Sequence, residues 1–431
     1  MLPPLGSCLG AERDVIVQHR PFGGDIILLT HHQAAWKNPD ATFEDAHIYV
    51  HLKAVYILSL KKGGCKGQDS WIGAAQKFFH GDGSKGKVTV LSSLKAGKAM
   101  NQVTTEKPHE LLAATLSDDM SAVNTLIQTR MASEHAPRIP EVTAHLVGAG
   151  GKRLRPMLTL AAARLCGYEG AHHVKLAATV EFIHTATLLH DDVVDESGQR
   201  RGRPTANLLW DNKSSVLVGD YLFSRSFQLM VETGSLRVLD ILANASATIA
   251  EGEVLQMTAA SNLATDEAIY LQVVRGKTAA LFSAATEVGG VIAEAPAEQI
   301  KALFDYGDAL GIAFQIADDL LDYQGDTAAT GKNVGDDFRE RKLTLPVIKA
   351  VAQATDEERA FWTRTIEKGQ QKEGDLEQAL ALMAKYGTLE ATRQDALLWA
   401  EKATESLVAL PEHPIRQMLQ DLAEYVVSRL R

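Results

Sequence analysis

Cysteine is scarce in this sequence: its 431 residues include three, Cys8, Cys65 and Cys166, without the spacing of a metal site. Scattered cysteines exclude a disulfide framework and are typical of a protein from a reducing cytosol. A long apolar run is also missing, because the best candidate, residues 48–60, falls short of the roughly 20 residues that span a membrane. No basic-then-apolar signal pattern opens the chain. We therefore expect a cytoplasmic protein.

Positive charge is not in excess either, since the formal net charge is −10 at pH 7. An acidic balance argues against nucleic acid as the main partner. Hydrophobic residues make up 45% of the chain and charged residues 23%, which suffices for an ordinary globular core.

The first 99 residues differ from the rest in charge and in pattern. They carry more Lys and Arg than Asp and Glu, show little periodicity and contain repeated Gly, Lys and Ser. This composition favours a loosely structured segment. We expect residues 1–99 to be an untranslated leader or a dispensable, poorly structured extension, and residues 100–431 to form one all-α domain.

From residue 108 onward, apolar residues recur at helical spacing, and Gly and Pro punctuate many of the gaps. No segment alternates with period two. The sequence therefore predicts an all-α fold, a bundle of ten or more helices around a central cavity. The expected helices cover residues 108–127, 156–165, 171–195, 206–232, 237–261, 266–288, 297–324, 340–353, 356–368, 375–387, 391–408 and 413–430.

Two D-D-x-x-D clusters each end a long apolar run that reads as helix. The first and third carboxylates of each cluster are four residues apart and share a helix face. Clustered carboxylates repel one another unless a cation neutralises them, and carboxylate oxygens without His or Cys suit Mg2+. The alternative, a solvated helix end, fits one copy better than two. The predicted metal ligands are Asp191, Asp192 and Asp195 in the first cluster, and Asp318, Asp319 and Asp322 in the second.

Two basic, glycine-bounded segments, residues 150–156 and 198–204, are candidates for binding diphosphate. Paired glycines allow close backbone approach, and Arg can grip phosphate oxygens with two hydrogen bonds. Cations are unusual before a helix N-terminus, and a bound anion would account for them. A basic helix start or a solvated loop on the surface is the alternative for each segment.

Several isolated polar residues fall in helical stretches. His184 lies two turns before Asp191 on the same face, and Gln315 is a polar group in an apolar run. The alternative for His184 is a structural histidine whose hydrogen bonds are all made within the core. Gly276-Lys277-Thr278 offers a cation and a hydroxyl, although a helical Lys is usually exposed.

Four motifs together resemble the signature set of the trans-isoprenyl diphosphate synthases, or polyprenyl synthetases. The resemblance rests on G-G-K-R-L-R-P, L-L-H-D-D-V-V-D-E-x-x-x-R-R-G, G-K-T and F-Q-I-A-D-D-L-L-D-Y, in that order, and spans about residues 108–431. It implies a helical fold with a central cavity, Mg2+ as cofactor and usually a homodimer. One departure is Arg341, which stands where many long-chain members carry Gly.

The resemblance also implies roles for individual residues. The first aspartate cluster holds Mg2+ at an allylic diphosphate, with Arg200 beside it, and the second cluster holds the other metal. Contacts to isopentenyl diphosphate fall on Lys152, Arg155, His184 and Arg201. Groups near the allylic diphosphate and the developing cation are Lys277, Thr278, Gln315 and Lys332. The residues expected to carry catalysis are Asp191, Asp192, Asp195, Lys277, Thr278, Gln315 and Asp318.

The implied reaction accounts for these residue types. An allylic diphosphate loses its diphosphate, the metal and the cations stabilise the departing charge, and isopentenyl diphosphate attacks. The growing tail is expected to run from the first cluster toward the N-terminal end of its helix, past Ala186 and Thr187. Both are small, so the sequence predicts an all-trans product of about C40 to C50, for a quinone side chain. The protein would contact a membrane at most peripherally, through this product.

Other readings remain open. A shorter-chain farnesyl or geranylgeranyl diphosphate synthase is one, and a non-catalytic subunit of a heteromeric synthase is another, although such a subunit should lack one cluster. A terpene cyclase or head-to-head synthase would not need the basic segment at residues 150–156. A purely structural helical protein would leave its acidic clusters solvated.

Overall fold

The computed structural model describes residues 107–148, 150–324, 334–428 and 430, all within one compact unit, Thr105–Arg431. The extension predicted for residues 1–99 lies outside the described residues. Within the described ranges, no helix is both long enough and apolar enough to cross a membrane.

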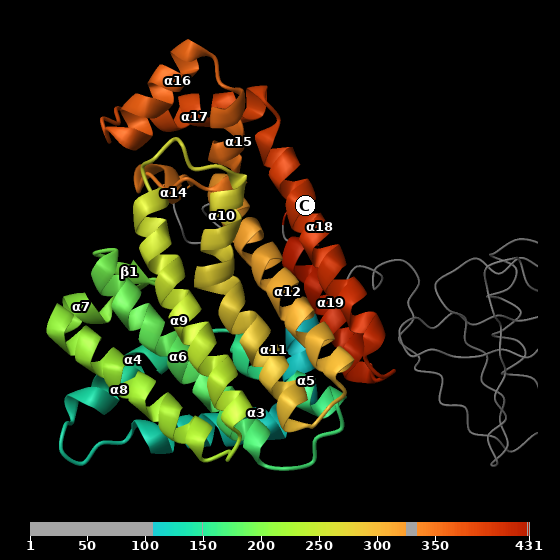
Figure 1. The fold of residues 1–431 in the computed structure, drawn as a ribbon. Coiled ribbons are helices and arrows are strands. Elements are labelled where there is room, and N and C mark those ends of the chain that lie inside the picture. Colours follow the sequence, from blue (N-terminus) through green and yellow to red (C-terminus); the bar gives the residue numbers. More distant parts are fainter. Residues whose placement is uncertain (1–106, 149, 325–333, 429, 431) are drawn as a thin grey trace, which may run out of the picture. The chain divides into compact units, whose positions relative to one another are not determined.

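The all-α prediction is confirmed: long helices run side by side, and shorter ones cover one end of the bundle (Figure 1). The helices are α2 (Pro108–Thr115), α3 (Ser117–Met131), α4 (Arg138–Gly148), α5 (Leu154–Leu165), α6 (His172–Val194), α7 (Ala206–Leu209), α8 (Asn212–Val231), α9 (Leu236–Ala259), α10 (Glu267–Val274), α11 (Ala280–Ile292), α12 (Ala297–Gln324), α14 (Asp336–Arg339), α15 (Leu345–Gln353), α16 (Asp356–Trp362), α17 (Asp375–Lys385), α18 (Thr388–Ser406) and α19 (Pro414–Ser428). Two π-helical turns, η2 (Arg275–Ala279) and η3 (Thr363–Glu367), and a 3-10 turn, η4 (Leu407–Ala409), complete them.

Some expected boundaries were wrong. The helix expected over 206–232 is broken, because the Asp211 side chain accepts a hydrogen bond from Ser214 N at 2.6 Å and caps a new helix, α8. The helix expected over 266–288 widens into η2. Three elements were missed: α4, α14, and a short antiparallel ribbon formed by β1 (Gln199–Arg200) and β2 (Arg203–Pro204).

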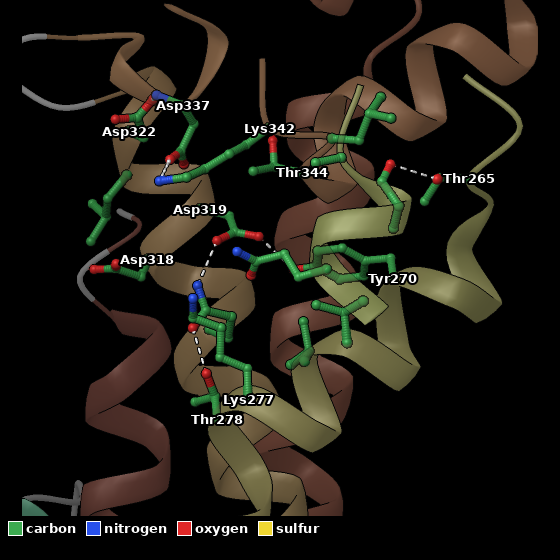
Figure 2. A pocket seen from close by; sticks show the side chains of 18 of the residues that line it. Thr265, Tyr270, Lys277, Thr278, Asp318, Asp319, Asp322, Asp337, Lys342 and Thr344 are labelled. Carbon is green, nitrogen blue, oxygen red and sulfur yellow. Dashed lines mark hydrogen bonds and ion pairs between the residues drawn. The ribbon is translucent and has the colours of Figure 1, made fainter. Parts of the chain in front are cut away.

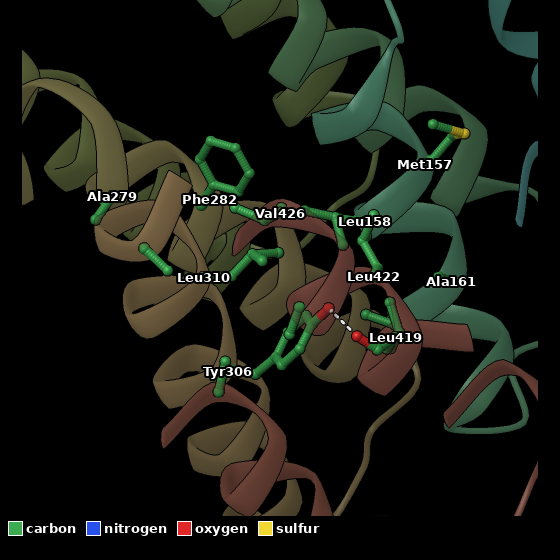
Figure 3. Packing of buried hydrophobic residues seen from close by; sticks show 14 of the residues in the cluster. Met157, Leu158, Ala161, Ala279, Phe282, Tyr306, Leu310, Leu419, Leu422 and Val426 are labelled. Atoms are coloured by element: carbon green, nitrogen blue, oxygen red, sulfur yellow. Dashed lines mark hydrogen bonds between the residues drawn. The ribbon is translucent and has the colours of Figure 1, made fainter. Parts of the chain in front are cut away.

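Helices α5, α11, α12 and α19 pack around a core of fully buried side chains (Figure 3). Leu158 of α5, Phe282 of α11 and Leu310 of α12 are each at most 1% exposed. Tyr306 is also buried there, and its hydroxyl donates to the carbonyl oxygen of Leu419 at 2.8 Å. This core holds α12, which carries the second acidic cluster at its C-terminal end.

Helices α14 to α17 lie at one end of the bundle (Figure 1). They enclose a separate small core in which Phe338 and Trp362 are at most 1% exposed. The segment that joins α14 to α15 includes Arg341, whose φ of 59° is in the left-handed region that favours glycine. This end of the bundle lies against the end of α12 that carries the acidic cluster, because Asp337 N of α14 donates a hydrogen bond to Asp322 Oδ2 at 3.1 Å.

Candidate active site formed by two adjoining pockets

The larger pocket, of about 700 Å³, opens between α9, α10, η2, α12 and the segment around α14 (Figure 2). It gathers the polar residues that the sequence singled out near the second acidic cluster. Those that line it are Lys152, Lys277, Thr278, Gln315, Asp318, Asp319 and Asp322, together with Tyr270, Asp337 and Lys342.

The three aspartates of α12 occupy different surroundings. Asp318 is exposed to the pocket, and Asp322 is half-buried and accepts a hydrogen bond from Asp337 N at 3.1 Å. Asp319 is 6% exposed and lies beneath them. Asp318 and Asp322 are one helical turn apart and line the same pocket, as the i, i+4 spacing predicted.

Asp319 belongs to a hydrogen-bonded chain of buried groups. Tyr270 donates its hydroxyl to Oδ2 of Asp319 at 2.6 Å, and Gln315 Nε2 donates to Oδ1 at 2.7 Å. Thr278 Oγ1 in turn donates to Gln315 Oε1 at 2.8 Å. Burial and the charge of Asp337 raise the pKa of Asp319 to about 8, against these two hydrogen bonds, which favour the ionised carboxylate.

Lys277 is presented by the π-helical turn η2, which crosses α9 at very short range. A Cβ on Gly252 of α9 would lie 2.6 Å from Lys277 N and 2.8 Å from Gly276 Cα, so only glycine fits on either side. At this crossing, Lys277 Nζ forms an ion pair with Glu253 Oε2 at 2.9 Å. Wide helical turns of this kind often occur at functional sites.

The first acidic cluster ends α6 on the other side of Lys277. Burial and the charges of Glu253 and Asp195 raise the pKa of Asp191 to about 7, and the charge of Lys277 opposes this rise. Lys342 also lines the larger pocket; against the effect of burial, Asp337 and Glu340 raise the pKa of its ammonium, and Asp195 contributes a smaller part of that rise. The two clusters therefore share the cations that line one pocket.

Asp192 points elsewhere. It is fully buried, and its Oδ1 accepts hydrogen bonds from Nε and Nη2 of Arg200 at 2.9 and 2.8 Å. Its Oδ2 is buried without a hydrogen-bond partner. The ribbon of β1 and β2 returns Arg200 to α6, and the ion pair joins the first acidic cluster to the second pocket.

The second pocket, of about 300 Å³, adjoins the first because Lys152 lines both. It is strongly basic, and two buried carboxylates, Glu181 and Asp192, balance part of its charge. The cations that line it are Lys152, Arg153, Arg155, Arg200 and Arg201, with His145 and His184 beside them.

Buried side chains next to this pocket hold two of its arginines in place. Arg153 forms an ion pair with Glu181, whose pKa burial raises despite that neighbour. Arg155 Nη1 lies 3.3 Å from His184 Nε2, and its guanidinium stacks 4.4 Å from the Phe282 ring centre. Burial, aided by the charge of Arg155, holds the pKa of His184 well below its ordinary value. His184 is therefore a neutral partner in this pocket.

Most sequence-predicted residues come together here, but not all. Ala186 is fully buried in the core and Thr187 is half-buried, and neither lines these two pockets. Asp191 and Asp195 do not line them either, but they lie within electrostatic reach of Lys277 and Lys342, which line the larger pocket. Lys332 lies outside the described residues. Sequence reasoning missed Tyr270, Glu181 and Glu253; only the burial of polar groups within apolar helices could have signalled them.

The donor set fits a hard divalent cation. In the described residues, no three His, Cys, Asp or Glu side chains converge closely enough to hold a metal ion on their own. Mg2+ does not require such a cage, because it usually takes one or two carboxylates, several waters and substrate phosphates. Pairs of carboxylates four residues apart, at the end of α6 and on α12, match that mode of binding.

Comparisons with known proteins agree with this geometry. Residues 136–383 match the family described as Polyprenyl synthetase. The octaprenyl diphosphate synthase of Escherichia coli (strain K12) is 47% identical over 326 residues, which cover 76% of this chain and 99% of that protein. The crystal structure of a decaprenyl diphosphate synthase from Rhodobacter capsulatus is similar with a TM-score of 0.74 and 76% identity, covering 75% of this chain and 100% of that one.

A polyprenyl synthase from Caulobacter crescentus CB15, complexed with calcium and isoprenyl diphosphate, is similar with a TM-score of 0.72 and 50% identity. The match covers 76% of this chain and 99% of that one.

Proposed function

The chain belongs to the polyprenyl synthetase family and makes long-chain all-trans polyprenyl diphosphates, and we propose that it does so with Mg2+ between its two acidic clusters. The reaction is the head-to-tail condensation of isopentenyl diphosphate onto an allylic prenyl diphosphate. One observation carries the assignment of substrates to sites: an acidic pocket and a basic pocket meet at Lys152.

The allylic diphosphate occupies the larger pocket. Asp191 and Asp195 on one side, and Asp318 and Asp322 on the other, would hold the metal, and the buried Asp192 and Asp319 support these pairs from behind. Bound there, Mg2+ would neutralise charge that builds on the departing diphosphate. Lys277 and the predicted contact Lys332 bind the same diphosphate, and Arg200 lies beside it.

Isopentenyl diphosphate occupies the basic pocket. Lys152, Arg155 and Arg201 bind its diphosphate, while the neutral His184 donates or accepts a hydrogen bond without adding charge. This arrangement holds the double bond of isopentenyl diphosphate next to the allylic carbon, which converts a bimolecular step into an effectively intramolecular one.

The carbocation that develops between the pockets needs a polar but dry environment. Thr278 and Gln315 offer oxygen atoms there, and the Phe282 and Phe314 side chains line the neighbouring wall. Water is kept out so that it does not quench the cation. After the new carbon–carbon bond forms, the resulting cation loses a proton. The released diphosphate accepts this proton, so no side-chain base is required.

The product is proposed to be about C40 to C50 and to serve as a quinone side chain. The names of the similar proteins, octaprenyl and decaprenyl diphosphate synthase, support this length. The small side chains of Ala186 and Thr187 support it too, since neither would block a tail that runs along α6.

The protein is proposed to act as a cytoplasmic homodimer. Apolar side chains on neighbouring helices are exposed, among them Leu217 (66%) and Val231 (66%) of α8 and Met257 (66%) of α9. A second copy would cover such a face. L217E should therefore give monomers in light scattering, while L398E, at an exposed leucine on α18, should not.

One incubation tests the function. Purified protein with labelled isopentenyl diphosphate, an allylic primer and Mg2+ should release diphosphate and yield C40 to C50 alcohols after dephosphorylation. EDTA should abolish the reaction, and added Mg2+ should restore it. Full activity after removal of all divalent ions would disprove the role given to the metal.

A further inference from the structure

We propose that Tyr270 is a positioning residue for the allylic half of the reaction: through Asp319, it fixes the direction in which Gln315 presents its amide oxygen to the larger pocket. The inference rests on the proposed function, because it assigns a use to that oxygen. Nothing in the sequence motifs singled out Tyr270, which belongs to α10, seven residues before Lys277.

The chain of contacts is short and sheltered. Tyr270 and Asp319 are 5% and 6% exposed, and Thr278 is 6% exposed. Three elements contribute: α10 supplies the phenol, α12 supplies Asp319 and Gln315 one turn apart, and η2 supplies Thr278. Figure 2 shows Tyr270, Asp319 and Thr278 among the side chains that line the pocket, with dashed lines for the hydrogen bonds of this chain.

Hydrogen-bond chemistry sets the direction of each link. Both oxygens of Asp319 accept hydrogen bonds, so the side of the Gln315 amide that faces Oδ1 is its NH2 group. The amide oxygen is then turned toward Thr278 and the pocket. A flipped amide would place its oxygen against Oδ1 of Asp319, two acceptors at 2.7 Å, which is repulsive.

Tyr270 completes the arrangement. Its hydroxyl donates to Oδ2 of Asp319 and thereby holds the plane of the carboxylate. Without that hydroxyl, a buried oxygen loses its donor, and the carboxylate can rotate toward the donor that remains. Gln315 then loses the fixed acceptor that sets its orientation, and its partially negative oxygen no longer faces the carbon where positive charge develops.

The test compares two tyrosine-to-phenylalanine variants of the full chain. Y270F removes the proposed link, and Y306F removes a buried phenol–carbonyl hydrogen bond of similar length in the core. With farnesyl diphosphate, isopentenyl diphosphate and Mg2+, we expect kcat of Y270F to fall about tenfold per folded molecule, the effect of one hydrogen bond to a charged group. The KM for isopentenyl diphosphate and the Mg2+ concentration for half-maximal rate should stay unchanged.

Y306F should lose a similar amount of thermal stability and keep its kcat, because its lost hydrogen bond is far from the pocket. A double variant supplies a further criterion. If Tyr270 acts through Gln315, Y270F combined with Q315A should cost no more than Q315A alone. D319N, which can accept from one donor but not two, should resemble Y270F and leave the Mg2+ requirement unchanged.

The inference is overturned if Y270F keeps the wild-type kcat, if the two substitutions add, or if D319N raises the Mg2+ requirement as loss of a metal ligand would. Should Y270F not fold, D319N and the Mg2+ titration decide alone. A wild-type protein that forms no elongated product would instead refute the proposed function.

Discussion

The close crossing of α9 and η2 at Gly252 and Gly276 predicts that an alanine at position 252 lowers the catalytic rate. An alanine Cβ at position 252 would lie 2.6 Å from Lys277 N, whereas ordinary van der Waals contact begins at 3.4 Å. The obstacles are backbone atoms, which cannot rotate away, so the two segments must separate by about 0.8 Å, the difference between these distances. Lys277, with its ion pair to Glu253, moves with the backbone that is displaced.

The expected magnitudes for stability and for rate differ. Replacing a mid-helix glycine by alanine gains about 1 kcal/mol in helix propensity, while overpacking costs about 1–3 kcal/mol. The free energy of unfolding of G252A should therefore fall by about 2 kcal/mol at most. A displacement near 1 Å of a group with the role proposed for Lys277, binding the reacting diphosphate, can lower the rate about a hundredfold. We expect kcat/KM for the allylic substrate to fall roughly 10- to 100-fold.

G289A is the matched control. A Cβ on Gly289 of α11 would lie 2.6 Å from the Cβ of Ala162 and 2.8 Å from Ala163 N, an equally tight crossing that contributes no residue to either pocket. Initial rates per folded molecule and thermal denaturation of both variants form the assay. If G252A retained wild-type kcat/KM, or if G289A lost as much activity, the link from this crossing to Lys277 would be refuted.

Three further predictions follow from other parts of the fold. Arg164, by hydrogen bonding, holds the pKa of Asp119 below its ordinary value, so this carboxylate stabilises the fold at neutral pH. D119N should lower the free energy of unfolding by about 2 kcal/mol at pH 7, and urea titrations should show this difference shrinking as the pH falls below about 4. A186F should shorten the products seen by chromatography, and an unchanged length would contradict the proposed path of the tail. E181Q, which removes the carboxylate under the basic pocket, should raise KM for isopentenyl diphosphate several-fold and leave KM for the allylic substrate unchanged; equal changes in both would argue for a purely structural role.

The sequence predicted the elements of the site because their signals are local. Periodicity predicted α6 and α12, and the four-residue spacing of Asp318 and Asp322 placed both carboxylates in one pocket. The helix break at Asp211 also had a local cause, a capping side chain, which the apolar pattern on either side obscured. Local rules therefore sufficed for the long helices that carry the acidic clusters, but they missed α4 and failed where one polar residue interrupts a continuous apolar pattern.

The partners of the site residues could not be predicted, because they come from distant parts of the chain. Tyr270 is 49 residues from Asp319, and Glu181 is 28 residues from Arg153. Each is an ordinary residue of an amphipathic helix until tertiary packing brings it to a charged neighbour. Buried ionisable groups must be paired or hydrogen-bonded, but which partner each finds depends on how the helices cross.

In the proposed reaction, the end of α6 separates the binding sites of two substrates that carry the same charge. Consecutive helical residues point about 100° apart, so Asp191 and Asp192 cannot face the same space. Asp191 interacts electrostatically with Lys277, which lines the larger pocket, while Asp192 forms an ion pair with Arg200 at the basic pocket. The last turn of α6 thus lies between the two pockets. The larger, acidic pocket requires a cation before it can hold a diphosphate, whereas the basic pocket does not. Because the two pockets neutralise phosphate by opposite means, each diphosphate can be held without the charge of one repelling the other at full strength.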